Sequence, residues 1–205
     1  DCNLNCIYCY QEHDTKSKMS VETAFRCIDW IFDNVPSNMS GVEIGFIGGE
    51  PLLEFELIKT IVEYVCTYKN NHNFIFYATT NGTVLAEEMK TWLVKHRNCF
   101  VLALSIDGTK ETHDHNRCHS FDKIDFNFFL KHHPEQSVKM TLSDFSLPRL
   151  AENIKFIHSL GFKNIGGVNL SEGEFDWSDD KHIQALIPQL RELVDFYVDN
   201  DTFLN

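Results

Sequence analysis

The sequence predicts an α/β fold with a parallel sheet, because two hydrophobic periods alternate along its 205 residues. Short runs of apolar, β-branched and aromatic residues have the composition of strands. Between these runs, apolar residues recur three and four positions apart, as they do on one face of a helix. Strands that alternate with helices form right-handed βαβ units, so the strands should be parallel and should lie beneath the helices.

Five segments are expected to be strands, since each is short and rich in residues that favour a pleated surface. They cover residues 42–47, 73–79, 100–106, 138–142 and about 164–170. In barrels and in open parallel sheets, ligands bind at the carboxyl ends of the strands. Functional residues should therefore be found in the loops that follow these segments.

Four stretches show helical periodicity. The first should begin after Ser20, whose hydroxyl can cap a helix, and it carries Glu22 in its first turn. Its apolar residues share one face and are Ala24, Cys27, Ile28, Ile31 and Phe32. The other three stretches are marked by Ile58, Ile61, Val62, Val65 and Cys66, by Leu150, Ile154 and Ile157, and by Ile183, Leu186, Ile187, Leu190, Val194, Tyr197 and Val198.

The first of these helices has no strand before it, because the chain opens in a loop that should follow one. The chain also begins without a methionine and runs directly into a cysteine cluster. We therefore expect the sequence to be a piece of a longer protein, with a first strand upstream of it.

The composition is ordinary for a globular domain, with 43% hydrophobic and 23% charged residues, so one domain is expected. The formal net charge of -12, without a Lys/Arg cluster, argues against nucleic acid as a partner. No run approaches the roughly 18 apolar residues that span a bilayer, and no signal peptide opens the chain. A cytoplasmic protein without a membrane partner is expected.

Three of the seven cysteines, Cys2, Cys6 and Cys9, lie within the first nine residues, which is poor geometry for a disulfide framework. Their spacing lets one short loop place three thiolates around one face of a metal or cluster. Two interpretations stay open. One is an iron-sulfur cluster with an iron left open, and the other is structural zinc with His13 or another histidine as the fourth ligand.

The remaining cysteines favour the open iron. Cys27 and Cys66 lie on apolar helix faces, where a cysteine usually packs as a small hydrophobe. Cys99 precedes a strand, and Cys118, in a polar loop, is the one candidate for an extra ligand.

The CxxxCxxC spacing, with Tyr8 just before the third cysteine, resembles the signature of the radical S-adenosylmethionine (SAM) superfamily. The segment Gly48-Gly49-Glu50-Pro51 follows the first expected strand and resembles the GGEP loop of that family, which lines the amino group of the SAM methionine. The resemblance implies a [4Fe-4S] cluster on the three cysteines, SAM on its open iron, and contact between Tyr8 and the adenine.

Later strand ends carry the next motifs in the same order. The stretch 105–117 is similar to one in radical SAM enzymes that modify peptides and in anaerobic sulfatase maturases, where its serine and arginine contact the SAM carboxylate. The resemblance assigns that role to Ser105 and Arg117, and the planar guanidinium suits a carboxylate. Asn81 and Asp107 are further expected cofactor contacts, with a loop-bracing role as the alternative for Asp107.

Three histidines, His113, His115 and His119, occur in the same stretch and could suggest a metal site. Metal-binding histidine pairs more often share a helix face or converge on a cysteine. We interpret these three as solvated or hydrogen-bonded residues of a loop.

The resemblance covers nearly the whole chain and implies a partial (β/α)6 TIM-like barrel, with residues 1–205 forming a radical SAM core domain. An auxiliary-cluster domain of the SPASM or Twitch type is expected to be absent from this chain, since no cysteine follows Cys118.

The implied function is reductive cleavage of SAM to a 5′-deoxyadenosyl radical, which abstracts hydrogen from a peptide or protein in ribosomal-peptide or sulfatase maturation. Flavodoxin or ferredoxin is the expected reductant. Two alternatives remain. One is a radical SAM activase or small-molecule enzyme, and the other is a non-catalytic zinc or iron-sulfur binding module.

Overall fold

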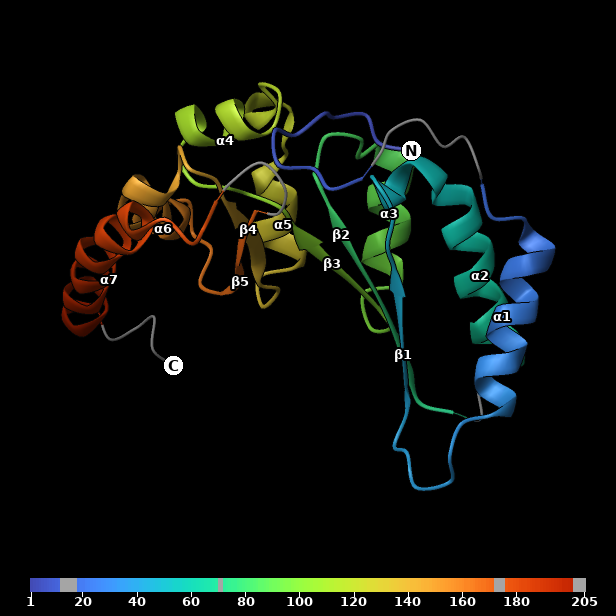
Figure 1. Ribbon diagram of the computed structural model, residues 1–205. Helices are drawn as coiled ribbons and strands as arrows, with labels where there is room; N and C mark the ends of the chain where they lie inside the picture. Colours follow the sequence, from blue (N-terminus) through green and yellow to red (C-terminus); the bar gives the residue numbers. More distant parts are fainter. Residues whose placement is uncertain (12–17, 70–71, 172–175, 201–205) are drawn as a thin grey trace. The chain divides into compact units, whose positions relative to one another are not determined.

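The computed structural model describes residues 1–11, 18–69, 72–171 and 176–200 (Figure 1). By their internal contacts, the residues form two compact units. The first comprises Asp1–Asn3, His13–Thr80 and Val84–Leu102, and the second comprises Leu4–Glu12, Asn81–Thr83 and Ala103–Asn205.

The first unit is built on a three-stranded sheet of order β1-β2-β3, in which β1 and β2 are parallel. The strands are β1 (Val42–Phe46), β2 (Phe74–Thr80) and β3 (Phe100–Leu104), whose last two residues belong to the second unit. The helices are α1 (Val21–Asp33), η1 (Pro51–Glu54), α2 (Phe55–Tyr68) and α3 (Glu87–Lys95). The rings of Phe46, Phe76 and Phe100 stack across the three strands, and α1 packs against α2.

The start of α1 follows directly from its sequence. The backbone N–H of Thr23 donates to Oγ of Ser20 at 3.1 Å, which satisfies one of the free N–H groups of the first turn. The inner face of the helix buries Ala24, Ile28 and Phe32.

The interpretation of Cys27 and Cys66 as core residues is wrong for Cys27 and holds only in part for Cys66. Cys27 is exposed and Cys66 is half-buried. The rest of the unit covers only part of the apolar face of α1. The uncovered part carries Cys27 and borders an open groove beside β1.

The second unit contains the parallel pair β4 (Val138–Leu142) and β5 (Ile165–Leu170). Its helices are α4 (Lys110–Asn116), η2 (Phe121–Lys123), α5 (Phe126–His132), η3 (Leu147–Arg149), α6 (Leu150–Ser159) and α7 (Asp180–Asp199). Directly after β3, Ser105 forms a parallel bridge with Lys139 of β4, and the backbone N–H of Ile106 donates to the carbonyl oxygen of Lys139 at 2.8 Å. The loop after β3 is thereby fixed beside β4.

The expected alternation of strands and helices is confirmed. All five strands begin and end within two residues of the expected positions, and the four expected helices are present. Among the described residues, the expectation lacks three α-helices, α3, α4 and α5, and the short 3-10 helices η1, η2 and η3. Because α4 contains only polar residues, its sequence has no hydrophobic period to detect.

No helix among the described residues has both the length and the apolar character needed to cross a bilayer.

Candidate functional site

Gly49 lies where the chain leaves β1 and passes close to Asp1 and Cys2. A Cβ at Gly49 would lie 2.3 Å from the carbonyl oxygen of Asp1 and 2.7 Å from Cβ of Cys2, whereas a Cβ at Gly48 would meet nothing within 4 Å. The backbone N–H of Glu50 donates to the same Asp1 oxygen at 2.9 Å. Only glycine at position 49 permits this close approach, which holds Cys2 beside the carboxyl end of β1.

The carboxylate of Glu50 is buried, with 2% of the residue exposed. Its Oε1 accepts a hydrogen bond from the backbone N–H of Leu52 at 3.1 Å and another from the hydroxyl of Thr80 at 2.8 Å. Thr80 ends β2, so this side chain ties the loop after β1 to the end of the neighbouring strand. Glu50 therefore gives the loop a fixed shape.

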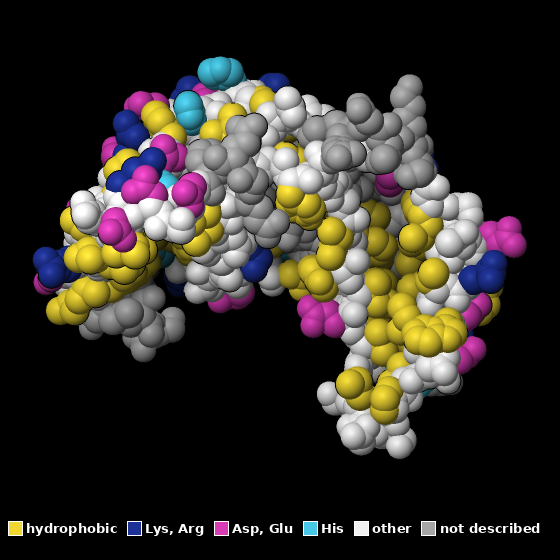
Figure 2. Space-filling view, in the orientation of Figure 1, with side chains coloured by type: hydrophobic (Ala, Val, Ile, Leu, Met, Phe, Trp, Pro, Cys, Tyr) yellow, Lys and Arg dark blue, Asp and Glu magenta, His cyan; other side chains and the backbone are white. Residues whose placement is uncertain are grey.

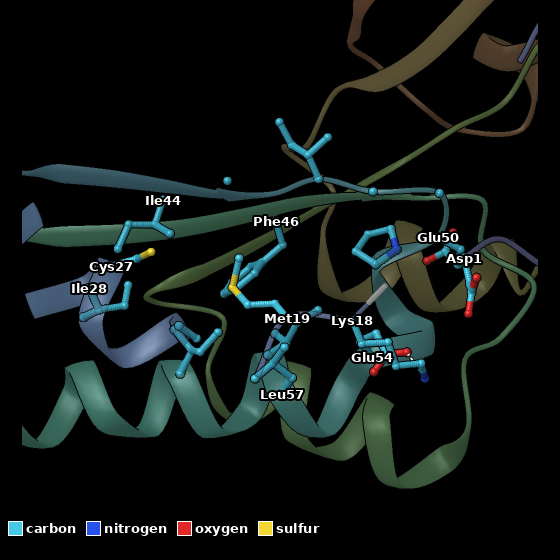
Figure 3. Close-up of a pocket in the computed structure, with 18 of the residues that line it drawn as sticks. Asp1, Lys18, Met19, Cys27, Ile28, Ile44, Phe46, Glu50, Glu54 and Leu57 are labelled. Carbon is cyan, nitrogen blue, oxygen red and sulfur yellow. Dashed lines mark ion pairs between the residues drawn. The ribbon is translucent and has the colours of Figure 1, made fainter. Parts of the chain in front are cut away.

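A groove of about 410 Å³ leads along α1, β1 and α2 to this loop. Its walls are apolar and include Ile28, Ile44, Phe46 and Leu57 (Figure 3). Figure 2 shows apolar side chains gathered on this part of the unit. The end of the groove near the loop is polar, where Asp1 and Glu50 lie close to an ion pair between Lys18 and Glu54.

The cysteine loop is divided between the units. Cys2 belongs to the first unit, whereas Cys6 and Cys9 belong to the second, where the backbone N–H of Cys9 donates to the carbonyl oxygen of Cys6 at 3.0 Å. None of the three cysteines forms a disulfide among the described residues. Within the described ranges, no group of three His, Cys, Asp or Glu side chains forms a preassembled metal site. His13 lies outside the described residues.

Asp107 is the centre of the hydrogen-bond network in the second unit, and it is fully buried. Its Oδ2 accepts from the hydroxyl of Tyr8, from Nε of Arg117 at 3.0 Å and from Nδ2 of Asn116 at 3.1 Å. Its Oδ1 accepts from the backbone N–H of Thr141 at 3.1 Å. One carboxylate thus joins the cysteine loop, the end of α4 and strand β4.

The charges of this network stabilise one another. Burial penalises the carboxylate, but the charge and the hydrogen bond of Arg117 hold the pKa of Asp107 below its ordinary value. Burial also disfavours the guanidinium, yet attraction to Asp107 outweighs this penalty and raises the pKa of Arg117. Burial raises the pKa of Tyr8 well above its ordinary value, although the charge of Arg117 opposes the shift. At neutral pH the network is a buried ion pair with a neutral tyrosine as a further donor.

Arg117 can hold a second acid group. Its Nε bonds Asp107, and among the described residues no hydrogen bond occupies either of its Nη atoms. The charge of Cys6 is among the effects that raise the pKa of Arg117, so the cysteine lies close enough to interact electrostatically with the guanidinium. The arrangement can bind an anion next to the cysteine loop.

Ser105 and Asn81 occupy the ends of β3 and β2. Ser105 is 8% exposed and lies two residues before Asp107 in the same loop. Asn81 uses its Oδ1 to accept hydrogen bonds from the backbone N–H of Thr83 at 3.0 Å and from the Thr83 hydroxyl at 2.7 Å. This amide oxygen shapes its own turn.

The interpretation of the three histidines as loop residues is wrong for His113 and His115, which lie on α4. His113 is fully buried, with its Nδ1 accepting from the backbone N–H of Asp107 at 3.4 Å and its Nε2 lying 3.0 Å from the hydroxyl of Ser120. His115 stacks on Phe145. The expectation that His113 is hydrogen-bonded is confirmed.

His113 should make the stability depend on pH. Burial, followed by the charge of Arg117, lowers the pKa of His113 to about 4, below its ordinary value near 6.5. Between these two values the unfolded chain binds the proton and the folded chain does not, so stability is complete above about pH 6.5 and falls as the pH falls. From pH 7 to pH 5, we expect His113 to contribute a loss of about 2 kcal/mol to the free energy of unfolding. Urea unfolding of the wild type and of His113→Gln at both pH values measures it. The same pH dependence in the variant would contradict this assignment.

Sequence reasoning missed three residues that support the site, namely Asn116, Thr141 and Asn153. Asn153 on α6 accepts from the backbone N–H of Thr109 at 3.0 Å and packs against Gly108, which has a φ of +122°. Gly108 is the one sequence feature that could have indicated this contact. A glycine can mark a place where another group comes close to the backbone, but it does not indicate which residue that is.

Comparisons with known proteins point to one family. The family model described as Radical SAM superfamily matches residues 1–178. An uncharacterised protein of Methanocaldococcus jannaschii is 30% identical over 174 residues, which cover 80% of this chain and 57% of that protein. A cysteine-type anaerobic sulfatase-maturating enzyme of Clostridium perfringens is 25% identical over 224 residues, which cover 100% of this chain and 59% of that enzyme.

Solved structures show the same fold. Native anSMEcpe with bound AdoMet aligns with a TM-score of 0.83 at 23% identity, over 100% of this chain and 59% of the other. Native anSMEcpe with bound AdoMet and Cp18Cys peptide aligns with a TM-score of 0.82, over 98% of this chain and 58% of the other. The likeness confirms the expected fold class, a partial TIM-like barrel with parallel strands. The chain spans less than two thirds of the length of these relatives.

Proposed function

The chain belongs to the radical SAM superfamily, and we propose that it is the cofactor-binding part of an enzyme that modifies a peptide or protein. Enzymes of this superfamily use a [4Fe-4S] cluster and SAM. Two observations support the fit of this chain to these cofactors. The three cysteines lie within one loop of nine residues, and the backbone at Gly49 comes so close to Cys2 that it fixes the first of them.

Cys2, Cys6 and Cys9 would hold the cluster and leave one iron for SAM. The backbone of Gly48 and Gly49, with the buried Glu50, would receive the amino end of the SAM methionine. Two adjacent glycines allow a ligand to approach the backbone, and carbonyl oxygens accept from an ammonium group.

Arg117 and Ser105 would receive the SAM carboxylate. The Nη atoms of Arg117 can meet two carboxylate oxygens while its Nε stays on Asp107. Because Arg117 is already ordered by a buried ion pair, little side-chain entropy is lost when the ligand binds. This preordered arginine is the observation that carries the proposal.

Tyr8 would contact the adenine through its ring, since its hydroxyl is committed to Asp107. Asp107 would act through Tyr8 and Arg117 by fixing their positions, and Asn81 would border the same site. When bound, the two cofactors supply a one-electron reductive cleavage of SAM that yields methionine and a 5′-deoxyadenosyl radical. The residues of this chain would orient SAM and exclude water from it.

A peptide or protein substrate is supported by the relatives. One is named for sulfatase maturation, and anSMEcpe has been solved with a bound peptide. Flavodoxin or ferredoxin would deliver the electron.

Anaerobic reconstitution of the full-length protein tests the proposal. We expect about four irons per chain and release of 5′-deoxyadenosine from SAM after reduction with dithionite. The triple variant Cys2→Ser, Cys6→Ser and Cys9→Ser should lose both the iron and the release of 5′-deoxyadenosine. Cys27→Ser, at an exposed cysteine of α1, should change neither the iron content nor this release. A wild-type protein that binds one zinc ion and cleaves no SAM would contradict the proposal. Formation of a modified product from a candidate peptide then tests the substrate class.

A further inference from the structure

The end of α4 is bound to the cysteine loop through its backbone and through a thiol. The backbone N–H of Ile7 donates to the carbonyl oxygen of Asn116 at 3.0 Å. Two residues further on, the thiol of Cys118 donates to the carbonyl oxygen of Asn5 at 2.7 Å. These contacts fix the loop on both sides of Cys6.

The residue between them adds a third contact. The guanidinium carbon of Arg117 lies 5.4 Å from the centre of the Tyr8 ring, within the range of a cation–π interaction. Both side chains also bond Asp107. Three consecutive residues, Asn116, Arg117 and Cys118, therefore contact the loop, and we call them the loop clamp.

The backbone that follows the helix is strained. Cys118 has a φ of 54° and His119 a φ of 53°, a left-handed conformation that residues other than glycine seldom adopt. Strain of this kind persists only where surrounding contacts over-determine the backbone. Here the backbone N–H of His119 donates to the carbonyl oxygen of Asp114 at 3.0 Å, and the Cys118 thiol is held on Asn5.

We propose that the loop clamp positions the cysteine loop for its cluster, and that Cys118 is a positioning residue of this site and not a ligand. The thiol of Cys118 acts on the cluster through Asn5, which directly precedes Cys6. The inference rests on the proposed function, since it assumes that the loop holds a cluster.

The clamp also connects the two cofactor sites, because Arg117 lies in its middle. The loop clamp then contains the arginine that receives the SAM carboxylate, and it also contacts the loop that holds the cluster. Binding at either site orders the other, and by linkage the two effects are reciprocal. SAM should therefore slow the loss of iron, and this protection should depend on Cys118.

The experiment uses the full-length protein, reconstituted anaerobically with thiol reductant present. Cys118→Ala and Cys118→Gly both remove the donor. Alanine keeps the backbone strain of cysteine at this position, whereas glycine relieves it, so an effect that both variants share reports the lost donor. Cys118→Ser keeps a donor. Cys27→Ala is the matched control, because Cys27 is an exposed cysteine outside the clamp. The readouts are the rate of iron release to a chelator, with and without SAM, and the electron paramagnetic resonance spectrum of the reduced cluster.

We expect Cys118→Ala and Cys118→Gly to release iron about tenfold faster than the wild type, as when an outer hydrogen bond to a metal site is lost. SAM should protect these variants less, Cys118→Ser should recover most of the wild-type rate, and Cys27→Ala should match the wild type. SAM should change the spectrum of the wild type, because its iron is open.

Equal iron release from Cys118→Gly and the wild type would overturn the inference. So would a spectrum that SAM changes only after Cys118 is replaced, because the thiol would then be a ligand. If the wild type itself held no cluster, the proposed function would fail, which is a distinguishable result.

Discussion

Replacing Asp107 with asparagine should lower the free energy of unfolding by about 3–5 kcal/mol, the range for a buried charge that loses its partner. The carboxylate is fully buried and receives four hydrogen bonds, from Tyr8, Asn116, Arg117 and the backbone of Thr141. An asparagine amide can keep one oxygen acceptor, but it leaves the Arg117 guanidinium buried without a counter-charge. Urea unfolding at pH 7 measures the loss.

Asp122→Asn is the matched control. Asp122 also pairs with a cation, Lys110, but its side chain is 76% exposed, so its loss should cost less than about 1 kcal/mol. A second variant separates charge from shape. Asp107→Asn combined with Arg117→Met removes both charges and should be less destabilising than the sum of the two single changes. Equal losses from Asp107→Asn and Asp122→Asn would show that Asp107 does not organise the site.

Asp107 also shows which features of the site could be predicted from the sequence. Its place at the end of a strand follows from hydrophobic periodicity, and the resemblance to radical SAM enzymes marks its loop. Its hydrogen bond from Thr141, 34 residues later, depends on the bridge between Ser105 and Lys139. A single sequence contains no signal for such a pairing, so the bracing role of Asp107 could be stated only as an alternative.

The helix α4 illustrates a second limit. Its sequence is entirely polar, so no apolar face predicts a helix there. The helix buries His113 and Asn116 because their polar groups find partners in the adjacent loop and network. Polar side chains that are buried because they are hydrogen-bonded do not contribute to hydrophobic periodicity. By contrast, β2, β3 and β4 are recognisable because apolar composition and burial coincide there.

Replacing Gly49 with alanine should displace Cys2 and prevent stable binding of the cluster. The added methyl group would lie 2.3 Å from the Asp1 carbonyl oxygen and 2.7 Å from Cβ of Cys2, well inside van der Waals contact. Relief requires the backbone at Asp1 to move, because a carbonyl oxygen has no rotamer to change. That movement also breaks the hydrogen bond from the backbone N–H of Glu50 to Asp1.

Iron content after anaerobic reconstitution of the full-length protein measures the effect. We expect Gly49→Ala to retain less than about a tenth of the wild-type iron, since displacing a ligand should cost at least as much as losing an outer hydrogen bond. Gly48→Ala is the matched control, because a methyl group at Gly48 meets nothing within 4 Å, and it should keep its iron. The two glycines are adjacent and receive the same change, so a difference between them reports the contact with Cys2 and not the loss of a glycine. If both variants kept their iron, the close approach at Gly49 would not be what holds Cys2 in place.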